Sequence, residues 1–219
     1  MPINRPRRPS YRSASLTSRE ADRAIYIDFE GFTDRSPDLL GILCEENFKQ
    51  VVLKRSLVST TSSGSTSFQP IQSILRELKR RAESENRKII AYSEHEANMA
   101  RRYAQIDLLP VYKNARIIAE SMSRHDSRRD YSATQTSKDH LALLDFEYPP
   151  QIGVGQATTR LRIVQESIRY CGNYERCPES VKREWRNLLE YNRLDCVGMR
   201  FLVKTAVGRS IQREEQLEV

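Results

Sequence analysis

The chain has 219 residues, a net charge of +7 at neutral pH and a pI of about 9.3. It is long enough for one α/β domain, and it holds no run of about 18 apolar residues, the minimum for a transmembrane helix. A basic surface favours a polyanionic partner. The four cysteines form no Cys-x-x-Cys pair and the three histidines are scattered, which argues against a zinc site. We recognise no secretory signal, so we expect a cytoplasmic protein with reduced thiols. A disulfide bridge between Cys171 and Cys177 is the alternative.

The N-terminal residues 1–20 are rich in arginine, serine and proline, with no acid before Glu20. This composition predicts a disordered basic arm. It also suits an organellar transit peptide, but a clear apolar helical face is missing, so we favour the arm. We expect the main domain over 21–210 and a polar tail over 211–219.

The first predicted strand, 24–31, is apolar except for two acids, Asp28 and Glu30. Alternation places these acids with Tyr26 on one face and the apolar side chains on the other (Ile25, Ile27 and Phe29). Neighbouring acids on a strand repel each other, so a divalent cation with oxygen ligands is the simplest explanation. A solvated strand face that ends at Gly31 is the alternative.

The next segments alternate between strands and helices. The pattern of residues 39–45 and 50–57 predicts two strands that form a hairpin. The segment 59–67 is rich in serine, threonine and glycine, which predicts a mobile loop. A helix follows, with Ser67 as its N-cap and apolar residues at helical spacing (Ile71, Ile74, Leu75 and Leu78). Residues 88–92 predict a short buried strand. Later elements are a helix over 94–105, a strand over 115–119, a helix near 137–144, a flexible loop over 149–160 and a final helix over 178–208.

The final helix carries a buried acid. Asp195 falls on its apolar stripe, four residues after Tyr191. A carboxylate there costs several kcal/mol unless it is paired or binds a metal. An ion pair with Arg193 or Arg200 is the alternative, although both lie on other faces of the helix.

Three segments together carry a family resemblance. Asp28-Phe29-Glu30 resembles the first motif, D-x-E, of the DnaQ-like 3′→5′ exonucleases of the ribonuclease H-like superfamily. Tyr191 and Asp195 resemble their third motif, Y-x-x-x-D. Residues 92–96 resemble the second motif of a divergent branch, the predicted RecB-family nucleases. The resemblance implies an α/β fold with a mixed sheet, three antiparallel strands and then parallel strands, flanked by helices.

The resemblance also implies roles for these residues. Such enzymes bind two Mg²⁺ or Mn²⁺ ions about 4 Å apart. Asp28 would bridge both ions, Glu30 would hold the ion nearer the nucleophile, and Asp195 would be a ligand from the last helix. Tyr191 would orient the attacking water.

The fourth acid is open. Glu96 takes that place in the resemblance, but Ser93 and Glu96 also form a capping-box pattern, S-x-x-E, which would give Glu96 a structural role only. Glu94 and Glu120 are the other candidates.

Two basic features suggest contacts with substrate. The segment 123–131 combines an aromatic residue with basic ones that could grip a nucleic-acid backbone (Arg124, Arg128 and Arg129). A solvated loop is the alternative. Lys138 lies in a segment, 137–141, that resembles a lysine-bearing helix start of the divergent branch.

The sequence therefore predicts a metal-dependent nuclease, a 3′→5′ exonuclease on single-stranded or frayed nucleic acid, with DNA favoured over RNA. An endonuclease or an RNA-directed enzyme on the same fold is an alternative. A second class of alternative is a catalytically silent relative that binds nucleic acid or protein. A third is an interaction module, in which Asp195 pairs with an arginine and Glu30 faces solvent.

Overall fold

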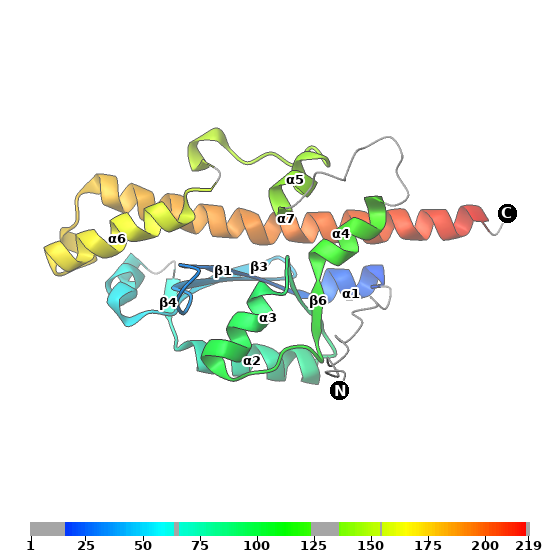
Figure 1. Ribbon diagram of the computed structural model, residues 1–219, viewed down its shortest axis with the longest axis horizontal. Coiled ribbons are helices and arrows are strands. Elements are labelled where there is room, and N and C mark those ends of the chain that lie inside the picture. The colour runs from blue at the N-terminus through cyan, green and yellow to red at the C-terminus, as the bar shows by residue number, and fades with distance from the viewer. Residues whose placement is uncertain (1–15, 64–65, 124–135, 154, 218–219) are drawn as a thin grey trace, which may run out of the picture.

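The computed structural model describes residues 16–63, 66–123, 136–153 and 155–217. Within these residues the protein is α/β, with six strands in one mixed sheet of order β4-β3-β2-β1-β5-β6 (Figure 1). β1, β2 and β3 are antiparallel, whereas β4 joins β3, β5 joins β1 and β6 joins β5 in parallel. The strands are β1 (Ile25–Glu30), β2 (Leu39–Cys44), β3 (Asn47–Val52), β4 (Thr66–Phe68), β5 (Ile89–Ala91) and β6 (Tyr112–Asn114).

Helices cover both faces of the sheet. The long helix α7 crosses one face together with α6, and α2 and α3 cover the other (Figure 1). The α-helices are α1 (Ser18–Arg23), α2 (Ile71–Ser84), α3 (His95–Met99), α4 (Ala115–Ser123), α5 (Ser137–Ala142), α6 (Ala157–Cys171) and α7 (Glu179–Leu217). Shorter turns are η1 (Arg55–Ser63), η3 (Pro150–Ile152) and η4 (Tyr174–Arg176), and the π-helical turn η2 (Ala100–Ala104) continues α3.

The alternation of β1 decides which residues meet α7. Ile25 and Ile27 are fully buried against the cluster that contains the apolar face of α2. Tyr26 points the other way, into a cluster built largely by α4 and α7, and its hydroxyl donates a 2.8 Å hydrogen bond to the Ala21 carbonyl. The predicted two-face pattern of this strand is therefore confirmed. Because side chains two apart share a face, Asp28 and Glu30 follow Tyr26 toward α7.

Residues 115–119 are helical, so the strand predicted there is wrong. The strand beside β5 is β6, which ends at Asn114, and α4 begins at the next residue. The Asn114 side chain accepts the backbone N–H of Arg116 at 3.0 Å, as a cap does at a helix start. An apolar run of five residues does not by itself distinguish a strand from a buried helix.

The hairpin is confirmed, but its second strand is shifted. β3 begins at Asn47 rather than residue 50, after a two-residue turn in which Glu45 takes a left-handed φ of 55°. The segment 59–67, predicted as a mobile loop, instead contributes to η1 and β4. Thr60 is buried there, and its hydroxyl donates to the Leu57 carbonyl at 2.7 Å.

Helix boundaries differ from those predicted at several other places. The N-cap of α2 is Pro70, because Ser67 lies in β4. The helix α6 occupies part of the predicted loop 149–160, and its apolar spacing was the signal that we missed (Leu161, Val164 and Ile168). The helix α7 continues through Leu217, into the predicted polar tail. At the other end Leu16 is buried and α1 begins at Ser18, inside the predicted arm; residues 1–15 lie outside the described residues.

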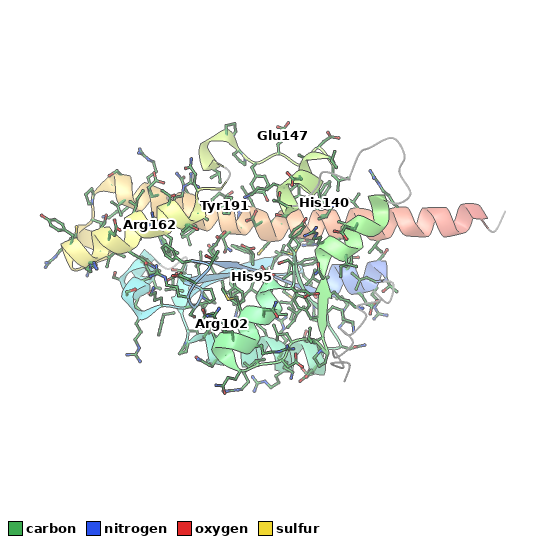
Figure 2. All side chains as sticks on the ribbon, viewed as in Figure 1. His95, Arg102, His140, Glu147, Arg162 and Tyr191 are labelled. Carbon is green, nitrogen blue, oxygen red and sulfur yellow. The ribbon has the colours of Figure 1, made fainter. Side chains whose placement is uncertain are left out.

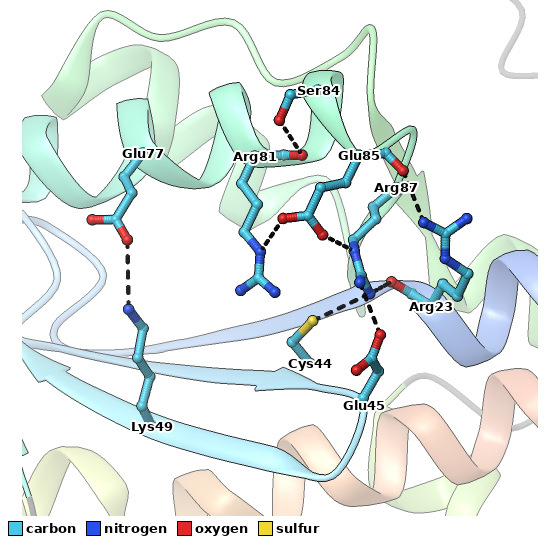
Figure 3. Close-up of polar contacts among 9 residues, drawn as sticks. All are labelled: Arg23, Cys44, Glu45, Lys49, Glu77, Arg81, Ser84, Glu85 and Arg87. Carbon is cyan, nitrogen blue, oxygen red and sulfur yellow. Dashed lines mark hydrogen bonds and ion pairs between the residues drawn. The ribbon is translucent and has the colours of Figure 1, made fainter.

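A polar junction ties three elements together at one end of the sheet (Figure 3). The Arg87 guanidinium pairs with Glu85, after α2, and at 2.8 Å with Glu45, in the β2–β3 turn. It also donates to the Arg23 carbonyl at the end of α1, at 2.7 Å. The Arg87 side chain is only 9% exposed. This one residue therefore connects the sheet to helices on both of its faces.

None of the helices in the described part of the chain is long and apolar enough to cross a membrane. The cysteines are free thiols, including Cys171 and Cys177.

Candidate metal centre

Three carboxylates converge between the sheet and α7. Asp28 and Glu30 come from β1, and Asp195 comes from the middle of α7. Each offers one oxygen, and these three oxygens lie within 4.8 Å of one another. Glu30 is buried and the two aspartates are partly buried. A group of this kind could hold a metal ion.

Asn192 positions Asp28 from α7, and sequence reasoning missed it. Its side-chain amide donates to Asp28 Oδ2 at 2.8 Å and to the Asp28 carbonyl at 3.2 Å. The Asn192 carbonyl oxygen in turn accepts from Gln50 Nε2 at 2.9 Å. Asn192 and Gln50 are both buried, so this is a closed polar network inside the protein. The signal available in the sequence was a polar residue one helical turn before Asp195.

Gly41 makes room for this network. It pairs with Asp28 across the β1–β2 ladder, directly under Asn192. A Cβ atom at Gly41 would lie 2.4 Å from Asn192 Oδ1, which is closer than atoms can approach without displacement. A glycine in the middle of an apolar strand marks such a close approach, and this signal was present in the sequence.

Tyr148 positions Asp195 and was also missed. It lies between α5 and η3, and its hydroxyl donates to Asp195 Oδ1 at 2.5 Å. Its ring lies 6.2 Å from the Tyr191 ring. Nothing in the local pattern of residues 144–149 connects Tyr148 with Asp195, 47 residues further along the chain.

Lys138 reaches the same place from α5. Its ammonium group donates to the Tyr191 hydroxyl and lies 4.4 Å from the centroid of the Tyr191 ring, which Figure 2 labels. Its positive charge acts to lower the pKa of both Glu30 and Asp195, although burial dominates both values. The predicted Tyr191 and Lys138 therefore both lie at the carboxylates.

The three candidates for a fourth acid differ in burial and in their partners. Glu96 is buried on α3, but among the described residues it is not part of the group within 4.8 Å. The Ser93 hydroxyl donates to its carboxylate at 3.4 Å, and the N-cap residue of α3 is Glu94 rather than the predicted Ser93. Glu94 is exposed, and Glu120 pairs with Arg116 on α4 at 2.8 Å. Of the three, Glu96 alone is buried with its charge acting on Asp28 and Glu30.

The site is electrostatically strained without a cation. Burial, followed by the charges of neighbouring acids, raises the pKa of Glu30 to about 8 and that of Asp28 well above its usual range. Burial likewise raises the pKa of Glu96 to about 7. Among the described residues, no group donates a hydrogen bond to the buried Glu30 Oε1. Clustered acids with an unpartnered oxygen fit the donor set of a hard divalent cation.

The predicted substrate residues Arg124, Arg128 and Arg129 lie outside the described residues. No protein-family model, curated protein or solved structure matches this chain.

Proposed function

We propose that this protein is a metal-dependent nuclease that hydrolyses phosphodiester bonds, and that it acts as a 3′→5′ exonuclease on single-stranded or frayed DNA. The observation that carries the proposal is the convergence of Asp28, Glu30 and Asp195 within 4.8 Å, with Glu30 Oε1 buried and unpartnered among the described residues. An interaction module would have no use for an acid cluster that burial destabilises.

The sheet supports the proposal. The order β3-β2-β1-β5-β6, with the first three strands antiparallel and the next two parallel, is the order expected of a ribonuclease H-like domain. β4 extends this sheet beyond β3. In such a layout the central strand β1 supplies the first two acids, as it does here.

The donor set favours Mg²⁺ or Mn²⁺, because it consists of carboxylate oxygens without sulfur or imidazole. When bound, two such ions would activate a water molecule and stabilise the charge on the leaving oxygen. Asp28, Glu30 and Asp195 would hold them, with Glu96 as the fourth acid.

The remaining residues of the site orient these groups. Asn192 fixes the Asp28 carboxylate and Tyr148 fixes that of Asp195, each through a direct hydrogen bond. Lys138 donates to the oxygen of the Tyr191 hydroxyl, which leaves the hydroxyl proton free to be donated to a water molecule or a carboxylate. Tyr191 would in this way position the attacking water, and Lys138 would neutralise part of the charge of an incoming phosphate.

The test compares wild type with the isosteric variant Asp28→Asn on single-stranded oligonucleotides labelled at the 3′ or the 5′ end, in Mn²⁺, Mg²⁺ or EDTA. We expect a ladder of products with wild type in either metal, none in EDTA, and at least a hundredfold slower hydrolysis with Asp28→Asn. The matched control is Asp22→Asn, an exposed aspartate on α1. This control should cut like wild type.

Other outcomes assign the alternatives. Release of the 5′-terminal nucleotide first would reverse the polarity, and cutting of a circular single strand would make the protein an endonuclease. Faster hydrolysis of RNA than of DNA would change the substrate. Equal binding by wild type and Asp28→Asn without hydrolysis in any metal would leave a silent binding protein and contradict the proposal.

A further inference from the structure

A cavity of about 650 Å³ lies next to the carboxylates and is not part of them. The segment that follows β1 and one face of α6 build most of its wall. Its lining includes Phe32, Arg35, Arg162, Gln165 and Arg169. None of the three clustered acids lines it.

The cavity wall concentrates positive charge around one aromatic ring. The Arg35 guanidinium carbon lies 3.7 Å from the centroid of the Phe32 ring, and that of Arg162 lies 5.9 Å from it. Arg169 follows Arg162 by seven residues on α6, so both project from the same helix face, about 10 Å apart along its axis. Cation–π contact orients the first two guanidinium groups. Arg35 Nη2 also donates to Gln165 Oε1 at 3.2 Å, and the other N–H donors of these two arginines remain available.

These arginines have no carboxylate partner in the described part of the chain: no carboxylate oxygen there lies within 4 Å of their nitrogens. Asp34 and Glu166 also line the cavity, but they pair with none of the three. Arg160, on the same helix, behaves differently, because it is buried and contacts Glu184 at 3.2 Å. Three unpaired guanidinium groups that share one cavity make a site for an anion.

The cavity is connected rigidly to the metal centre. Phe32 follows Glu30 by two residues, so their Cα atoms are at most about 7 Å apart. Gln165 of α6 donates to the buried Asp38 at 2.7 Å, and Asp38 pairs with the Lys54 ammonium at 3.1 Å. These contacts hold α6 against the segment after β1. The helices α6 and α7 pack against each other. Figure 2 labels one residue on each of them, Arg162 on α6 and Tyr191 on α7.

We propose that this cavity binds backbone phosphates of the nucleic-acid strand whose scissile bond lies at Asp28, Glu30 and Asp195. The inference rests on the proposed function and narrows its substrate. The arginines and the acids form separate sites, so a single ligand that occupies both must be extended and must carry phosphates at more than one position, as a polynucleotide does. A mononucleotide ester reaches the acids alone. The substrate is therefore a strand of several nucleotides, held by sequence-independent phosphate contacts.

The test uses the double variant Arg162→Gln/Arg169→Gln. Its matched control is Arg76→Gln/Arg80→Gln, which removes the same charge from an exposed face of α2, on the opposite side of the sheet. Binding of fluorescein-labelled single-stranded dT12 is measured by anisotropy in an Asp28→Asn background, which prevents hydrolysis. Hydrolysis of the p-nitrophenyl ester of thymidine 5′-phosphate is measured with Mn²⁺ in proteins that retain Asp28.

We expect the cavity variant to bind dT12 at least about tenfold more weakly at 0.1 M salt, and to lower the slope of log K against log salt by about 1.4, the value for two phosphate contacts on a single strand. The control should change the affinity less than twofold. Both double variants should hydrolyse the small ester at the wild-type rate, because it does not reach the cavity.

The cavity inference fails if the cavity variant binds dT12 like wild type, or if the control loses the same affinity, since net charge would then explain the effect. The two proposals separate cleanly. If wild type hydrolyses neither the labelled oligonucleotides nor the p-nitrophenyl ester, while the cavity variant loses dT12 binding, the nuclease proposal falls and the nucleic-acid site stands. If wild type hydrolyses the ester while the cavity variant binds dT12 like wild type, the nuclease proposal stands and the cavity inference falls.

Discussion

The side-chain amide of Asn192 donates to both the carboxylate and the main-chain carbonyl of Asp28, at 2.8 and 3.2 Å. One residue of α7 therefore fixes the position of the acid and of the strand that bears it. Gln50 of β3 completes the contact by donating to Asn192 and to the Leu189 carbonyl, both at 2.9 Å. The geometry of the candidate metal centre thus depends on how closely α7 approaches the sheet, which Gly41 permits.

Gly41→Ala should disrupt this approach. Its Cβ would lie 2.4 Å from Asn192 Oδ1, so the amide must move away from Asp28. We expect the free energy of unfolding to fall by about 2 kcal/mol, the usual effect of overpacking. Metal-dependent activity should fall about tenfold or more, because the support of a ligand is lost. Chemical denaturation and the oligonucleotide assay measure the two effects.

Two further variants control this experiment. Gly208→Ala, in α7 with no atom within 4 Å of its Cβ, should leave activity unchanged and stabilise the helix by about 1 kcal/mol. Gly41→Ala/Asn192→Ala should recover part of the stability, since the clash is gone, but not the activity. Equal behaviour of the two single glycine variants would contradict the close approach.

Mn²⁺ should stabilise the folded protein through Asp195. A ligand that binds only the native state at a hundred times its Kd adds about 2.7 kcal/mol to the free energy of unfolding. For a chain of this length this raises the Tm by roughly 5–10 °C. Asp195→Asn should lose most of this rise, and Asp22→Asn should keep it. A full rise in Asp195→Asn, seen by differential scanning fluorimetry, would remove Asp195 from the ligand set.

Without metal, stability should fall as the pH rises. Burial raises the pKa of Glu30 to about 8 and that of Glu96 to about 7, so the folded state binds more protons than the unfolded state above pH 4.5, the ordinary value for glutamate. Stability therefore decreases with pH until about pH 8 and then levels off. The two shifts together correspond to a loss on the order of 6 kcal/mol between pH 5 and 8 in EDTA.

Denaturant titrations at several pH values measure this loss. Glu30→Gln should make the profile shallower but not flat, since one titrating group is gone while Glu96 remains. Saturating Mn²⁺ should shift the stability maximum toward higher pH, because the metal requires the ionised carboxylates. A flat profile for wild type in EDTA would show that these acids are not buried together.

Tyr148→Phe should weaken the metal centre while preserving the fold. The substitution removes only the hydroxyl that donates to Asp195 at 2.5 Å and keeps the ring packed beside Tyr191. Loss of a ligand's supporting hydrogen bond typically costs 10–100-fold in metal affinity or activity, and we expect about tenfold. A Mn²⁺ titration of activity measures it. Tyr170→Phe is the control, since Tyr170 is 93% exposed; equal effects would exclude a positioning role for Tyr148.

Arg87→Met should destabilise the protein without a direct effect on the site. The side chain is 9% exposed and joins Glu45, Glu85 and the Arg23 carbonyl (Figure 3). Its loss removes two ion pairs and leaves the Arg23 carbonyl, in a partly buried contact, without this donor, and we expect about 2 kcal/mol of destabilisation in urea. Arg101→Met, which breaks an exposed pair with Asp107, should change stability by less than about 1 kcal/mol. Similar values for both would show that the junction around Arg87 contributes little.

Local patterns in the sequence were enough to predict the two faces of β1, the apolar face of α2 and most of α7. Each depends on a period of two or 3.6 residues, which burial against any apolar partner enforces. The same periodicities placed Asp28 and Glu30 together on one face of β1 and Asp195 on the buried side of α7. Where the apolar run was short, as at residues 115–119, the period was ambiguous and the element was assigned incorrectly.

The tertiary structure alone decided which of these buried faces meet. It brought Asp195 to within reach of Asp28 and Glu30, separated Glu96 from the closest group, and added Asn192, Gln50 and Tyr148. It also created the arginine-lined cavity from α6 and the segment after β1. Hydrogen bonds and charge–charge contacts act over a few ångströms, and such distances between residues far apart in the chain are set only when the sheet and helices pack.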